Sequence, residues 1–212
     1  LADRLLHVSH GMLRLPDGKM SSRKGTIIPA EELIDMVSER IKDRLEDMKV
    51  SGEDRADLVN AIAVGAIKFS ILKSAPGKDM IFDFEKSLSF EGDSGPYLQY
   101  THARMCALLE KAEQVGISID EYAVEQPERA LEQAIIQYTR TLDLACKDLG
   151  PHHIVIYLLS LSRAFNSMYA RQQIVDEANK DTSAYYVMLT QATKNILAHG
   201  LYTLGIVAPE RM

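Results

Sequence analysis

The segment Gly18 to Gly25, GKMSSRKG, brings together three cations, two hydroxyls and two flanking glycines. Glycines let a backbone approach a bulky anion, hydroxyls and amides donate hydrogen bonds to it, and Lys and Arg side chains offset its charge. The segment therefore suits a polyphosphate. It is not a Walker loop, because that motif needs a lysine directly after its second glycine, where this chain has Thr26. A solvated basic turn is the alternative that the residues alone leave open.

The sequence KMSSRKG resembles the KMSKS loop of class I aminoacyl-tRNA synthetases, in the form found in many arginyl-tRNA synthetases. In that family the loop closes over the triphosphate of ATP while the amino acid is activated. The family has its second lysine where this chain has Ser22, and Arg23 or Lys24 can substitute for it. The resemblance implies that Lys19 and Lys24 are catalytic, and that the ATP-binding residues of the loop are Lys19, Met20, Ser21, Ser22, Arg23 and Lys24.

A second segment, HVSHG at residues 7–11, resembles a stretch of arginyl-tRNA synthetases that lies against the adenine of ATP. The resemblance implies ATP contacts from His7, Val8 and Gly11, and a structural histidine pair is the alternative. HVSH is not the HIGH signature of the same class, because Ser9 replaces the glycine that allows close approach to the nucleotide. No other HxGH occurs, so we expect the catalytic half to be missing and this fragment to be inactive alone.

A helix that begins at Pro96 places Tyr97, Tyr100 and Arg104 on one face, at i, i+3 and i+7. Two aromatic rings and a guanidinium are groups that stack on splayed RNA bases and pair with phosphate. Packing of the tyrosines in a core is the alternative. The block FDFEKSLSFEGDSGPYLQY, residues 82–100, resembles the part of arginyl-tRNA synthetases in which a loop beside the anticodon stem precedes a tRNA-contacting helix. That resemblance favours tRNA contact by the three side chains.

The final stretch, HGLYTLGIVAPERM, resembles the C-terminal signature of the same family. In the family this terminus folds back toward the anticodon, which makes Met212 a candidate tRNA contact. We therefore expect one continuous surface that is formed by the SFEGDSG loop together with Tyr97, Tyr100, Arg104 and Met212.

Apolar residues recur at every third or fourth position over most of the chain, which predicts a mainly α fold. Short extended segments are expected around residues 5–15 and 80–84. The resemblance implies a helical-bundle anticodon-binding domain preceded by a short remnant of a class I Rossmann-type catalytic domain, with parts at residues 1–30, 31–94 and 95–212. The expected helices run from Pro29 to Gly52, over about 54–74, from Pro96, over 131–150, from Pro151, and from Thr182 or Ser183 to near Gly205.

The net charge of the 212-residue chain is −6, but the charge is uneven. Residues 1–30 carry five Lys or Arg against two Asp or Glu, whereas residues 95–212 carry ten against thirteen, so selected groups must meet any nucleic acid locally. No run approaches the roughly 18 apolar residues of a membrane span, and no secretory signal is visible. The cysteines, Cys106 and Cys146, fall in apolar helical patterns. We expect two buried thiols, a cytoplasmic protein without membrane contact, and no metal site within the chain.

These segments, read with the family, predict the C-terminal part of an arginyl-tRNA synthetase. The whole enzyme would attach arginine to tRNA(Arg) through arginyl adenylate, using ATP with Mg²⁺, and we expect a monomer. One alternative is a cysteinyl or glycyl enzyme with the same type of anticodon domain, against which the PERM ending and the SSRKG variant of the loop argue. Another is a free-standing helical module whose basic loop binds an acidic partner or is phosphorylated at Ser21 or Ser22.

Overall fold

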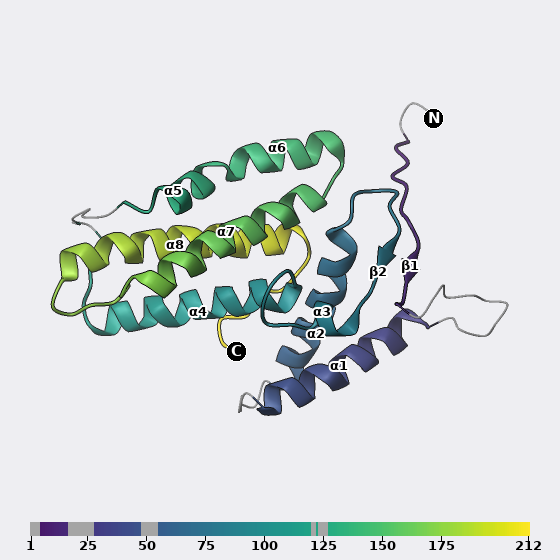
Figure 1. Ribbon diagram of the computed structural model, residues 1–212, viewed down its shortest axis with the longest axis horizontal. Helices are drawn as coiled ribbons and strands as arrows, with labels where there is room; N and C mark the ends of the chain where they lie inside the picture. Colours follow the sequence, from purple (N-terminus) through teal and green to yellow (C-terminus); the bar gives the residue numbers. More distant parts are fainter. Residues whose placement is uncertain (1–4, 17–27, 48–54, 120–121, 123–126) are drawn as a thin grey trace.

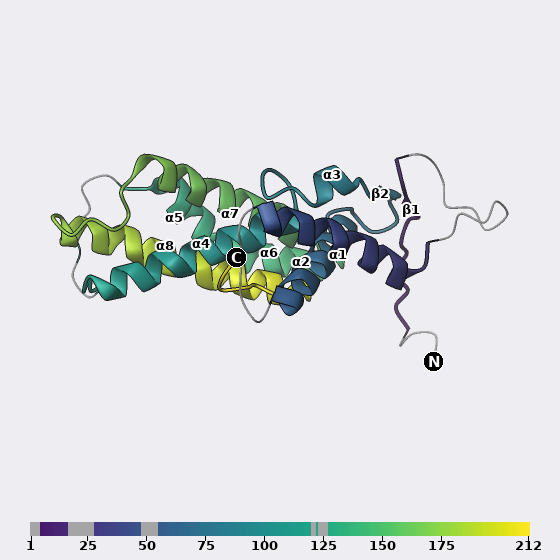
Figure 2. The same cartoon turned by 90° about the horizontal axis from the view of Figure 1, so that it is seen from below.

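The computed structural model describes residues 5–16, 28–47, 55–119, 122 and 127–212. Within them the fold is mainly α with two short strands, which confirms the predicted fold class. One end of the elongated molecule holds the first three helices and the strand pair, and the other end holds a helical bundle (Figure 1). Figure 2 shows the same division from below. The predicted KMSKS-type loop, Lys19 to Lys24, lies outside the described residues.

Helices α1 (Ala30–Asp47) and α2 (Arg55–Leu72) pack against each other. Leu33, Val37 and Ile41 recur at every fourth residue and are buried, because α1 covers α2 with one apolar stripe. α2 is apolar on more than one side, because it contacts α1 and also α4 of the bundle. This position makes α2 the connection between the two ends of the molecule.

The strands β1 (Leu13–Arg14) and β2 (Met80–Ile81) form a parallel pair beside α2. Gly11, just before β1, is required for this pairing, because a Cβ there would lie 2.0 Å from the carbonyl oxygen of Lys78. The short helix α3 (Phe84–Ser87) follows β2. The pair thus joins the N-terminal segment to the chain that leaves α2.

The bundle has one core of buried apolar side chains, to which Met105, Leu158 and Leu189 belong. A second, smaller apolar cluster lies between α1 and α2. In the bundle α4, α7 and α8 run side by side, and α5 and α6 lie along α7 (Figures 1 and 2). The bundle helices of the described chain are α4 (Gly95–Gln114), α5 (Arg129–Ile136), α6 (Tyr138–Asp148), α7 (His152–Arg171) and α8 (Lys180–Thr203).

The sequence predicted one helix over residues 131–150, and this prediction is wrong. The chain breaks at Gln137 into α5 and α6. In a continuous helix the carbonyl of Ala134 would accept from the N–H of Tyr138, whereas here it accepts from Gln137 at 3.2 Å and from the hydroxyl of Tyr157 at 2.8 Å. The ring of Tyr138 stacks on that of Tyr157, with centroids 5.5 Å apart. A side chain of α7 therefore sets the end of α5.

The junction of α2 with α4 depends on two glycines and one buried amide. A Cβ at Gly95 would lie 2.7 Å from the carbonyl oxygen of Gly65, and a Cβ at Gly65 would lie 2.8 Å from the side chain of Gln99. The amide of Gln99 donates to the carbonyl of Ala61 in α2 at 3.1 Å and to that of Val207 at 2.9 Å. Backbone therefore meets backbone here, and the C-terminal segment takes part in the junction.

We expect Gly95→Ala to lower the free energy of unfolding by about 1–3 kcal/mol, because the added methyl group overpacks the contact with Gly65. Alanine is ordinarily the better helix residue, so a loss of stability reports this contact rather than helix propensity. Urea unfolding followed by circular dichroism measures the effect. A midpoint equal to or above that of the parent would show that the two helices do not need their close approach.

The thiols differ from the expectation of two buried cysteines. Cys106 is half-buried, and burial raises the pKa of its thiol. Cys146 is exposed, which makes the expectation wrong at this residue, because it lies on the outer side of α6.

Of the helices that the structure describes, none is long and apolar enough to cross a membrane.

Candidate RNA interface

The N-terminus of α4 sets the direction of three candidate side chains. The hydroxyl of Ser94 caps the helix by accepting from the N–H of Tyr97 at 3.0 Å, and Pro96 occupies the first turn, where no N–H is needed. Tyr97, Tyr100 and Arg104 then lie on the side of α4 that meets α7. The three side chains therefore share one face of the helix, as their spacing predicted. None of them is fully buried.

The guanidinium of Arg104 lies over two tyrosine rings. Its Cζ is 4.9 Å from the ring centroid of Tyr100 on α4 and 4.9 Å from that of Tyr169 on α7. Such contacts hold a guanidinium against the rings and leave its remaining N–H groups free to donate to an acceptor. Tyr169 is 41% exposed, which keeps this arrangement accessible from solvent.

The side chain of Asn166, on α7, connects the two helices. Its Oδ1 accepts from Nη1 of Arg104 at 2.5 Å, and its Nδ2 donates to the hydroxyls of Tyr97 at 2.9 Å and Thr101 at 3.2 Å. One amide therefore holds both the guanidinium and the hydroxyl of the first tyrosine. We call the following five side chains the tyrosine–arginine site: Tyr97, Tyr100, Arg104, Asn166 and Tyr169.

The loop before α4 borders the tyrosine–arginine site. Phe90 packs with its edge against Tyr100, and the ring centroids are 6.2 Å apart. Asp93 pairs with Lys73 at 3.5 Å and also with Arg163 of α7. These contacts tie the loop to the residue that follows α2, to α4 and to α7.

Met212 ends a segment that follows the other side of α4 from the tyrosine–arginine site. With about 3.6 residues per turn, Gln99 and His102 are on the opposite side of α4 from that site. The C-terminal segment follows this opposite side, because Gln99 binds the carbonyl of Val207 and Nδ1 of His102 donates to the carbonyl of Pro209 at 2.8 Å. Met212 itself packs, half-buried, against the cluster of α1 and α2. The expected tRNA contact of Met212, and its place on one surface with the tyrosines, stays a prediction.

The histidine that holds this segment favours its neutral form. Burial lowers the pKa of the His102 ring below its ordinary value of 6.5. Because a carbonyl only accepts, the proton of the neutral ring is on Nδ1, which faces Pro209. As the pH falls below the ordinary value, protonation favours the unfolded chain, so acid works against this contact.

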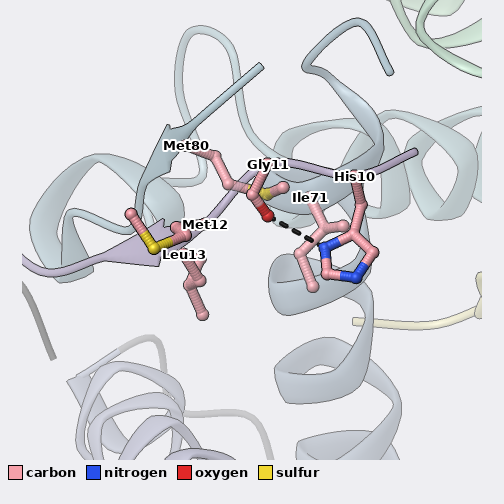
Figure 3. Close-up of a pocket in the computed structure, with 6 residues that line it drawn as sticks. All are labelled: His10, Gly11, Met12, Leu13, Ile71 and Met80. Carbon is pink, nitrogen blue, oxygen red and sulfur yellow. Dashed lines mark hydrogen bonds between the residues drawn. The ribbon is translucent and has the colours of Figure 1, made fainter. Parts of the chain in front are cut away.

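The segment HVSHG forms a less complete site. His7 and Val8 are exposed, and Gly11 is half-buried. Of the three, Gly11 lines a cavity of about 390 Å³ between the strand pair and α2, which falls in the range of small-molecule sites of roughly 300–1,000 Å³. Figure 3 shows the mainly apolar walls, to which His10, Met12, Leu13, Ile71 and Met80 also contribute.

A metal centre is not formed by the side chains that the structure describes. In that part of the chain, no three His, Cys, Asp or Glu residues come together as ligands. His152 and His153 do stack, with ring centroids 4.1 Å apart, but Nε2 of His153 lies 2.9 Å from the carboxylate of Asp148.

Known proteins match the chain along its whole length. Residues 98–212 match the DALR anticodon binding domain, and residues 2–84 match the catalytic domain of tRNA synthetases class I (R). The arginine–tRNA ligases of Amoebophilus asiaticus and Clostridioides difficile are 32% and 35% identical to it, over 100% of this chain. The chain belongs to the arginyl-tRNA synthetase family.

This arginyl-tRNA synthetase chain spans 37% and 38% of the length of those two relatives, and it matches a C-terminal part of them. The solved structure of the Thermus thermophilus arginyl-tRNA synthetase has the same fold, with a TM-score of 0.85 at 30% identity. That match covers 100% of this chain and 36% of the other. The helical bundle is therefore an anticodon-binding domain of the arginyl-tRNA synthetase type.

Two members of the tyrosine–arginine site in this arginyl-tRNA synthetase chain were missed from the sequence, Asn166 and Tyr169. Both lie on α7, and Asn166 is 62 residues beyond Arg104, so helix spacing could not connect them. A weaker signal was present, since Ser162, Asn166 and Tyr169 fall at i, i+4 and i+7 and form a polar stripe beside the apolar face of the helix. Such a stripe indicates a side of the helix that meets polar groups.

Proposed function

We propose that this chain is the part of an arginine–tRNA ligase that closes on ATP and binds the anticodon region of tRNA(Arg). The observation that carries the proposal is the tyrosine–arginine site, in which an accessible ring and a guanidinium lie side by side on α4 and α7. Rings stack on single-stranded bases, and a guanidinium binds the phosphates between them. Four of its five side chains lie within the DALR region and Tyr97 directly precedes it, which supports the anticodon as the segment that is bound.

The complete enzyme would join arginine to tRNA(Arg) through arginyl adenylate, with pyrophosphate leaving ATP. Lys19 and Lys24 would stabilise the charge that develops on the triphosphate, and the His7–Gly11 segment with the neighbouring cavity would receive the adenine. Mg²⁺ would enter with the phosphates of ATP, because magnesium is usually bound by phosphates and one or two carboxylates rather than by an all-protein cage. The arginine pocket would lie mostly outside this chain, which would therefore be inactive alone.

The organisation of the chain belongs to the same proposal. Residues 1–30 would be the edge of the catalytic domain, residues 31–94 a connecting segment, and residues 95–212 the anticodon-binding domain. The separate apolar clusters of α1–α2 and of the bundle support a division before α4. The protein would work as a monomer in the cytoplasm without contact to a membrane.

We expect Tyr169→Ala to weaken the binding of tRNA(Arg) by about 5- to 150-fold, which corresponds to the roughly 1–3 kcal/mol of one stacked base. The ring is 41% exposed, so its removal costs the bundle little. Tyr202→Ala is the matched control, because this tyrosine is 80% exposed on α8 and lies outside the site. Filter binding or fluorescence titration at fixed salt measures both variants.

Equal affinities for Tyr169→Ala, Tyr202→Ala and the parent would contradict the proposed interface. A competing tRNA with a different anticodon, such as tRNA(Cys), tests whether the synthetase type is right. The parent should bind tRNA(Arg) more tightly than this competitor. Equal binding of the two would indicate contact to the tRNA backbone alone.

A further inference from the structure

Arg104 differs from most of the other arginines that contact a side chain, because its partner is uncharged. In this net-negative chain, arginines that contact another side chain generally do so through a carboxylate, as do Arg14, Arg44, Arg163, Arg171 and Arg211. Among the described residues, Arg104 has no carboxylate within ion-pair distance, and its side-chain hydrogen bond goes to the neutral amide of Asn166. The site therefore keeps the whole positive charge of this guanidinium.

The orientation of the Asn166 amide is determined by its partners. Nη1 of Arg104 can only donate, so the group that faces it at 2.5 Å must be the oxygen Oδ1. The amide nitrogen then faces the hydroxyls of Tyr97 and Thr101, which accept from it. All three hydrogen bonds are satisfied in this one orientation, and the guanidinium is fixed over the rings of Tyr100 and Tyr169.

We infer that Asn166 is a positioning residue for RNA binding, which orients the guanidinium of Arg104 while leaving its charge available to a phosphate of the bound strand. The inference rests on the proposed function of the tyrosine–arginine site, and it adds the residue that orients the guanidinium before RNA binds. A carboxylate at residue 166 could make the same contact with Arg104, but it would neutralise the cation. A neutral amide provides the geometry without competing with the phosphate for charge.

Two substitutions separate geometry from charge. In Asn166→Asp the hydroxyl of Tyr97 can rotate and donate to the new carboxylate, while the hydroxyl of Thr101 keeps its hydrogen bond to the carbonyl of Tyr97, so we expect the fold and the position of Arg104 to persist. In Asn166→Ala the charge of Arg104 persists, but its orientation is no longer held. The first variant therefore removes the available charge, and the second removes the positioning.

The test measures the affinity of the chain for tRNA(Arg) as a function of salt concentration. We expect Asn166→Asp to weaken binding by about 10-fold at low salt and to reduce the slope of log K against log [salt] by about 0.7, the loss of one single-strand phosphate contact. Asn166→Ala should weaken binding with the slope unchanged. Ser167→Asp is the matched control, because it adds the same charge to an exposed neighbour on α7 and should change both quantities less. Urea unfolding midpoints equal to that of the parent verify the fold of each variant.

The double variant Arg104→Ala/Asn166→Asp shows whether Asn166 acts through Arg104. We expect it to bind like Arg104→Ala alone, because a carboxylate at 166 then has no cation to neutralise. If Arg104→Ala weakens binding but Asn166→Asp does no more than Ser167→Asp, the inference is overturned and the proposed function stands. If Arg104→Ala itself binds like the parent, the proposed interface fails as well.

Discussion

Alanine at Lys19 or Lys24 is expected to lower the rate of arginine activation by about 10²-fold or more in the full-length enzyme that carries this chain. A cation fixed where negative charge develops commonly contributes several kcal/mol to the barrier, and a 10²-fold loss corresponds to about 2.7 kcal/mol. The affinity for tRNA(Arg) should change far less, because the tyrosine–arginine site is on the helical bundle. Pyrophosphate exchange with ATP, arginine and tRNA(Arg) present measures the rate.

Ser22→Ala is the control within the same segment. Ser22 stands where the family has its second lysine, and a hydroxyl supplies no charge to the triphosphate, so its loss should matter less than that of either lysine. Unchanged rates in both lysine variants would mean that the segment GKMSSRKG is a solvated basic turn. The prediction rests on the sequence, since these residues lie outside the described part of the chain.

Phe165→Ala is expected to lower the free energy of unfolding by about 3–5 kcal/mol, a large part of the stability of a domain of this size. Phe165 is fully buried in α7, within the bundle core, so its truncation leaves a cavity that rigid neighbours can fill only in part. Urea unfolding of the purified parent and of the purified Phe165→Ala variant measures the loss of stability.

Ile156→Ala on the same helix is the comparison for Phe165→Ala. Ile156 is 56% exposed, and surface substitutions usually change stability by no more than about 0.5 kcal/mol. Similar losses for the two variants would contradict the assignment of the bundle core. A Phe165→Ala variant with the same unfolding midpoint as the parent would also contradict that assignment.

The helices that the sequence predicted well are those whose pattern depends on one buried face. α1 shows this, because the repeat of Leu33, Val37, Ile41 and Leu45 specifies its inner side. The break between α5 and α6 could not be predicted in this way. It depends on the hydroxyl of Tyr157, which reaches Ala134 from another helix, and no local pattern records that contact.

The residues of the candidate site likewise separate into those that helix spacing could predict and those that depend on the packing of helices. Tyr97, Tyr100 and Arg104 share one helix, so their common face followed from spacing alone. Asn166 approaches from α7, and its role depends on the packing of two helices. The path of the C-terminal segment along the opposite side of α4 could not be predicted from its own sequence, because it is set by the buried partners of Val207 and Pro209.

The parallel strand pair has a consequence for the order in which the chain assembles. α1 and α2 are neighbours in the sequence and can pack early, whereas the hydrogen bond between Met12 and Asp79 at the strand pair joins residues 67 positions apart. Contacts across so long a loop carry a larger entropy cost and form late during folding. The ladder has only two residues in each strand, so little offsets that cost. We therefore expect the strand pair to form after α1 and α2 have packed against each other.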